Sequence, residues 1–240
     1  LHRGAAASPA SGIAMRASSL VVVLVASLAP CLAPAASGIA PLAYDSAADE
    51  ACARDQRTPI DSAWIAELQS RLPEAQALWS VLGPRMFDAA SKAVGRTVAP
   101  PSVPVRLTLC AVPSQSYGFG GPLVNMRFAL SSFSAEPVPL RVKIDTAFHE
   151  SLHPFVQRFA PANSPMLLLH AAEPSCVRNH LHLLSLQKAV LLSLGQAREL
   201  AELIQVDERL PSGCYKRAWA IVNETPETYL RYVRELAGGA

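Results

Sequence analysis

The chain has 240 residues, 50% of them hydrophobic, and a formal net charge of only +2. So small a charge, carried by dispersed Lys and Arg residues, argues against a nucleic-acid partner and against an acidic membrane surface. The length is sufficient for one domain with a sizeable hydrophobic core.

The start of the chain is typical of an export signal. The residues before Met15 are rich in Ala and Ser, and we expect translation to start at Met15. Arg16 then supplies the positive end, residues 20–28 (LVVVLVASL) supply the apolar core, and the small residues at 33–36 supply the cleavage site. The apolar core is too short to span a bilayer comfortably.

Two regions follow from this interpretation. Residues 1–36 are predicted to be an upstream extension and signal peptide, and residues 37–240 a single exported domain, periplasmic or secreted. Lipidation at Cys31 ranks second, because Pro30 stands where a small residue is expected. After the signal is removed, no apolar run is long enough to span a membrane.

Four cysteines remain in the exported part of the chain. In an oxidising compartment they predict two disulfides, and three connectivities are possible. None of them has zinc-finger spacing; they are Cys52, Cys110, Cys176 and Cys214.

The first half of the exported chain predicts helices and then strands. A small, polar lead-in is expected first, then two helices, the first starting at Asp61. Alternating apolar residues then predict a strand, and a glycine-rich turn predicts a hairpin that leads into another strand. In order, these segments are 37–58, 61–72, 73–94, 103–110 and 116–130.

A five-residue motif, His149-Glu150-Ser151-Leu152-His153, reads HExxH. On a helix the two histidines are one turn apart and share a face, so both can bind one Zn²⁺. Glu150 can then act as the general base on a metal-bound water. Asp145 or Thr146 is the expected N-cap, and Pro154 predicts a kink or an end of the helix.

Helices dominate the remainder of the chain. Apolar periodicity predicts them at about 174–194, 196–209 and 225–237. Strands before the motif helix and helices after it predict an α+β domain.

A catalytic zinc site needs a third protein ligand, and Glu173 lies twenty positions after His153. HExxH followed by Glu at this distance resembles the gluzincins, the thermolysin-like metallopeptidases, over residues 149–173. The resemblance implies a zincin-like fold, with a small mixed or antiparallel sheet packed on the HExxH helix. It also implies His149, His153 and Glu173 as the metal ligands.

The match is imperfect at the third ligand. The gluzincin pattern has Asn before the ligand Glu, but Ala172 is found here. The dipeptide Asn179-His180 is a variant of that pattern, with imidazole in place of carboxylate. His180 is therefore the alternative third ligand, since zinc accepts either group. His182 and His170 rank below both.

The resemblance predicts an exported zinc metallopeptidase that acts on a peptide or protein substrate, with Glu150 as general base. An oxyanion donor is expected from among Tyr215, Tyr229, Tyr232 and His170. A strand before the metal helix, at 123–130, is expected to border the cleft. The alternatives are a hydrolase of cell-wall or other amides, an inactive zincin-fold binding or assembly protein, and a helical domain that binds no metal.

Overall fold

The structure is a computed structural model that describes residues 38–116 and 120–238. The expected signal peptide, its cleavage site and Cys31 lie outside these residues. The strands are β1 (Leu42–Tyr44), β2 (Val105–Thr108), β3 (Gln115–Ser116) and β4 (Pro122–Asn125). The helices are α1 (Ser46–Gln56), α2 (Ser62–Val94), η2 (Arg127–Ala129), α3 (Leu140–Phe159), α4 (Pro165–Leu168), α5 (Ser175–Ser193), α6 (Ala197–Asp207), α7 (Cys214–Val222) and α8 (Thr228–Leu236).

The strands form one mixed sheet in the order β1-β2-β4-β3. β1 and β4 pair with β2 in parallel, whereas β3 pairs with β4 as an antiparallel hairpin. β4 therefore lies inside the sheet, and every one of its residues is buried. The α+β prediction is confirmed. Either a mixed or an antiparallel sheet was expected, and the sheet is mixed.

The lead-in predicted before residue 58 is instead ordered. β1 pairs with β2, and α1 follows it at once, with the Asp45 carboxylate accepting a hydrogen bond from the Ala48 amide. Asp49 is buried and accepts hydrogen bonds from the Thr108 hydroxyl and from the amides of Leu109 and Cys110. These long-range contacts explain why a small, polar composition did not predict the two elements.

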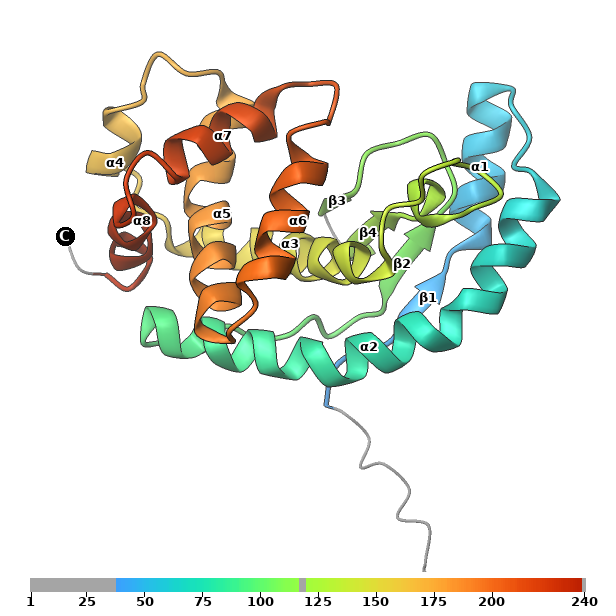
Figure 1. Cartoon of the computed structure of the whole chain (residues 1–240), viewed down its shortest axis with the longest axis horizontal. Coiled ribbons are helices and arrows are strands. Elements are labelled where there is room, and N and C mark those ends of the chain that lie inside the picture. Colours follow the sequence, from blue (N-terminus) through green and yellow to red (C-terminus); the bar gives the residue numbers. More distant parts are fainter. Residues whose placement is uncertain (1–37, 117–119, 239–240) are drawn as a thin grey trace, which may run out of the picture. The chain divides into compact units, whose positions relative to one another are not determined.

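The two helices predicted between Asp61 and Val94 are a single helix, α2. Asp61 caps it as expected, through a hydrogen bond from the Ala63 amide. Pro73 and Pro84 lie within the helix and do not end it. Buried side chains recur along α2 from Leu68 to Val94. The helix packs against β1, α3, α5 and α8 (Figure 1), which compensates for the hydrogen bonds that the prolines remove.

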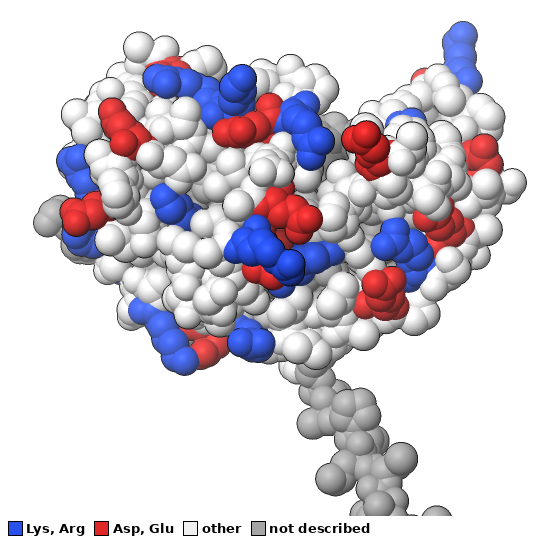
Figure 2. Space-filling model, viewed as in Figure 1, with Lys and Arg blue, Asp and Glu red and all other residues white. Residues whose placement is uncertain are grey.

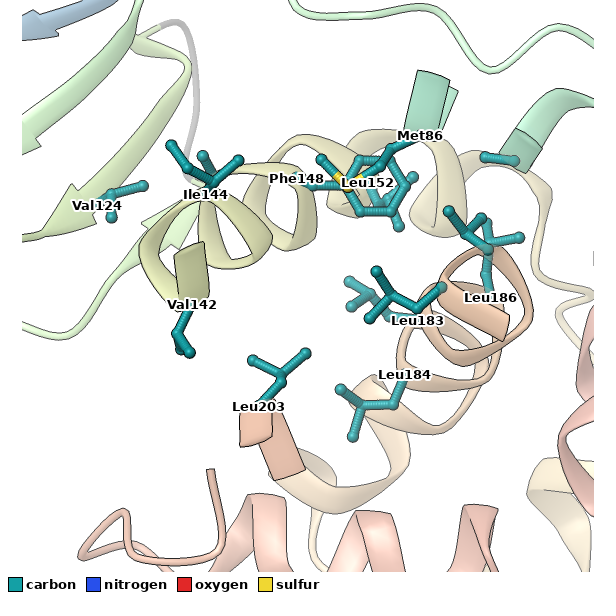
Figure 3. Packing of buried hydrophobic residues seen from close by; sticks show 14 of the residues in the cluster. Met86, Val124, Val142, Ile144, Phe148, Leu152, Leu183, Leu184, Leu186 and Leu203 are labelled. Carbon is teal, nitrogen blue, oxygen red and sulfur yellow. The ribbon is translucent and has the colours of Figure 1, made fainter. Parts of the chain in front are cut away.

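The motif helix, α3, starts earlier than predicted and passes through Pro154. Its N-cap is Pro139, not Asp145 or Thr146, and it ends at Phe159. Its apolar side chains point both to β4 and to α2 and α5, with Phe148 and Leu152 next to Met86 (Figure 3). Burial on several sides keeps α3 helical beyond the proline.

Three of the five described helices after α3 match the prediction, whereas α4 and α7 were not foreseen. α5, α6 and α8 lie where apolar periodicity placed them. α7 begins after Gly213, which has a φ of 67°, and carries Trp219 into the core. Within the described residues, no helix combines the length and the apolar character needed to cross a membrane.

The two expected disulfides are present, with the pairings Cys52–Cys110 and Cys176–Cys214. The first joins α1 to the segment after β2, and the second joins the first turns of α5 and α7. Both fit an oxidising environment. On the face shown in Figure 2, acidic and basic side chains are interspersed and form no large area of one sign.

Candidate metal centre

Two histidines of the motif face the same side of α3, as the helical period predicts. Their ring centroids are 5.1 Å apart. His149 is buried, and the His153 side chain is 18% exposed. The helix therefore places two ring nitrogens at one site that remains partly accessible.

His180 completes the cluster from the neighbouring helix α5. Its ring lies 5.5 Å from that of His149 and 5.6 Å from that of His153, measured between centroids. One potential ligand atom from each residue lies within 4.8 Å of the other two, so the three can hold a metal ion. Three imidazoles match the donor set of a catalytic zinc site, which keeps a further position open.

Glu173, the other predicted third ligand, does not join this cluster. It lies in the turn before α5, where its carboxylate accepts a hydrogen bond of 2.9 Å from Nε of Arg217. That hydrogen bond lowers the pKa of Glu173. The structure thus pairs Glu173 with α7 and brings His180 to the motif histidines.

Burial keeps the three imidazoles in the form that binds metal. It lowers the pKa of His153 to about 4 and that of His149 well below its ordinary value, and it also lowers the pKa of His180. The charges of the neighbouring histidine rings lower the pKa of His149 and His153 further. Neutral imidazole is the ligand form, so no deprotonation is required near pH 7.

Glu150 is buried beside the cluster, and one of its carboxylate oxygens has no hydrogen-bond partner among the described residues. Oε2 makes no hydrogen bond with the described residues and lies 3.5 Å from Nε2 of His153. Burial, and secondarily the charge of Asp207, raises the pKa of Glu150 to about 8. An orphaned buried carboxylate beside three imidazoles fits a metal site, because a bound cation and its water supply the missing partners.

Tyr215 is the one predicted oxyanion donor that reaches the histidines. Its Oη lies 3.2 Å from Nε2 of His149, and its ring lies 4.6 Å from that of His180. Tyr215 is the second residue of α7, directly after Cys214, so the Cys176–Cys214 disulfide ties it to the start of α5. Sequence patterns did not choose it because α7 itself was not predicted.

The other candidates have different surroundings. His182 is buried and hydrogen-bonds Glu235 at 2.7 Å, with its ring against Tyr232. Tyr229 lies against the ammonium group of Lys188. His170 follows α4 in a turn, where its carbonyl accepts from the Glu173 amide.

Two residues that sequence patterns did not single out stand next to the centre. Gln187 hydrogen-bonds Nδ1 of His149 at 3.0 Å, and Asp207 acts on Glu150 through its charge. Both come from helices that reach α3 only in the folded chain. No family model, curated protein or solved structure matches this chain, so the arguments about the site rest on its own geometry and chemistry.

Proposed function

We propose that this protein is a zinc-dependent metallopeptidase. The observation that carries the proposal is the convergence of His149, His153 and His180 beside the buried carboxylate of Glu150. The three imidazoles would hold the zinc ion, which would lower the pKa of a water molecule and polarise a substrate carbonyl.

Glu150 is positioned to act as the general base. The carboxylate takes a proton from the attacking water and passes it to the leaving amine. Its pKa of about 8 belongs to the metal-free site. A divalent cation in the histidine cluster would favour the ionised carboxylate, so that Glu150 would accept protons near neutral pH.

Tyr215 supports the same reaction as a hydrogen-bond donor. Its phenol lies against His149 at the edge of the cluster. A donor at this position stabilises the negative charge that develops on the substrate oxygen, an effect that typically contributes about 3 kcal/mol.

The strand predicted to border the cleft needs a correction. The 123–130 segment contains β4, which pairs with β2 on one side and β3 on the other, and η2. Its backbone groups are therefore used within the sheet. β1 and β3 are the two edge strands, and β3 is the one that packs against α3, so an extended peptide would add to β3.

The test is the variant Glu150→Gln of the purified protein, assayed against a peptide library and analysed for zinc. We expect about one zinc per chain in both proteins. We also expect a loss of turnover of at least about 100-fold in the variant. Glu173→Gln is the control, since its side chain lies outside the cluster, and it should keep both properties.

Two results would contradict the proposal. Turnover that persists in Glu150→Gln would exclude the assigned base. Wild-type protein that holds zinc but cleaves no peptide would favour a zinc-stabilised binding or assembly protein instead.

A further inference from the structure

Gln187 lies in α5 on the same face as His180. The two residues are seven positions apart, which is about two helical turns. The Gln187 side chain is 1% exposed, and its amide connects α5 to α3 at two points. These two contacts hold the helix of His180 to the helix of His149 and His153, so the Gln187 side chain does more than fill space.

The direction of the Gln187 amide follows from its backbone contact. Its Nε2 donates to the carbonyl oxygen of Asp145 at 3.0 Å, and a carbonyl can only accept. Its Oε1 is therefore the end that faces Nδ1 of His149, also at 3.0 Å. Because Oε1 has no hydrogen to give, Nδ1 must carry one.

The protonation of Nδ1 decides which His149 nitrogen can bind metal. A neutral imidazole has one N–H and one lone pair, so the lone pair lies on Nε2. His180 follows the same rule, since its Nδ1 is 2.6 Å from the carbonyl oxygen of Cys176. Both rings thus offer Nε2.

We propose that Gln187 is a positioning residue that holds His149 in the Nδ1–H tautomer and so makes Nε2 its metal-binding atom. This inference rests on the metal site of the proposed function. Partners of this kind fix the ring orientation and raise the basicity of the ligand. Without the Gln187 acceptor, the His149 ring is free to carry its proton on Nε2, where it would oppose the metal.

Two substitutions of similar size separate this role from packing. Gln187→Leu removes both hydrogen bonds. Gln187→Glu keeps an acceptor for His149 in either charge state and, when protonated, also keeps a donor for Asp145. Gln196→Leu is a matched control, because Gln196 accepts a hydrogen bond from Arg141 of α3 but does not contact the histidines.

Zinc affinity of the full-length protein is measured by competition with a chromophoric chelator. We expect about a 10- to 100-fold weaker zinc affinity in Gln187→Leu. Gln187→Glu and Gln196→Leu should stay within a few-fold of wild type. If Gln187→Leu kept wild-type affinity while folded, or if both Gln187 variants lost it equally, the role would be one of packing only.

A second measurement needs neither zinc nor turnover. Nitrogen-15 NMR of the metal-free protein reports which ring nitrogen of His149 carries the proton. We expect Nδ1–H in wild type and Gln187→Glu, and a shift towards Nε2–H in Gln187→Leu. Nε2–H in the wild-type protein would overturn the inference. Absence of peptide cleavage, with zinc bound and the tautomer as expected, would overturn only the proposed function, whereas absence of zinc binding would overturn both.

Discussion

Removal of the Cys176–Cys214 disulfide should damage the metal centre as well as the fold. Cys176 supplies the carbonyl that faces the His180 ring, and Cys214 precedes Tyr215. The perturbation is the double variant Cys176→Ser/Cys214→Ser, which leaves no unpaired thiol from this bridge. The Cys52→Ser/Cys110→Ser double variant is the matched control, because that bridge lies between α1 and the end of β2.

The expected losses of stability are nearly equal. The cysteines of the two bridges are separated by 38 and 58 residues. The dependence of loop-closure entropy on length gives about 4 kcal/mol for either bridge. Only the Cys176–Cys214 variant should also bind zinc more weakly, by about tenfold or more, because His180 and Tyr215 lose their common anchor.

The assay combines urea unfolding of the metal-free proteins with zinc competition at a temperature at which circular dichroism shows both double variants to be folded. Similar stability losses with a selective loss of zinc affinity in Cys176→Ser/Cys214→Ser would support the reasoning. Equal zinc affinities in the two folded variants would refute it, since they would show that the histidine cluster does not depend on this bridge.

Three further predictions address the ligands, the base and the sheet. His180→Ala should abolish stoichiometric zinc binding whereas Glu173→Gln should retain it, and elemental analysis of dialysed protein distinguishes them. Because burial raises the folded-state pKa of Glu150 to about 8, metal-free wild type should lose stability as the pH rises from about 4.5 to 8. The Glu150→Gln variant has no such carboxyl and should not show this loss. In urea unfolding it should be more stable than wild type at pH 8, by up to about a few kcal/mol, and as stable as wild type near pH 4.5. Asp49→Ala removes the acceptor shared by the Thr108 hydroxyl and the amides of Leu109 and Cys110, and among the described residues only the Cys110 amide keeps another partner, the Thr108 hydroxyl. The variant should lower the free energy of unfolding by about 3 kcal/mol, with the Thr108→Val variant losing less.

The failures of sequence-based prediction in the fold have a common origin in long-range contacts. β1 has three residues and pairs with a strand about sixty positions later, so no local sequence pattern predicts it. α2 passes two prolines because its buried side chains, from Leu68 to Val94, pack against elements distant in sequence. Intrinsic propensity is a weak signal where tertiary burial is this extensive.

In the candidate site, too, local patterns predicted some features and long-range contacts decided the others. The amino-acid sequence alone determined that His149 and His153 share a face with Glu150 between them, because the period of a helix is a local property. It also predicted two disulfides, because four cysteines follow the expected signal peptide, and the structure has both.

Only the tertiary structure decided which residues complete the centre. Along the chain, Glu173 and His180 were both acceptable ligands, but α5 begins at Ser175 and turns His180 towards α3 while Arg217 of α7 binds Glu173. Gln187 and Tyr215 reach His149 in the same manner, from α5 and α7. A helix's own sequence sets which side chains share its faces, whereas the packing of the whole core sets which faces meet.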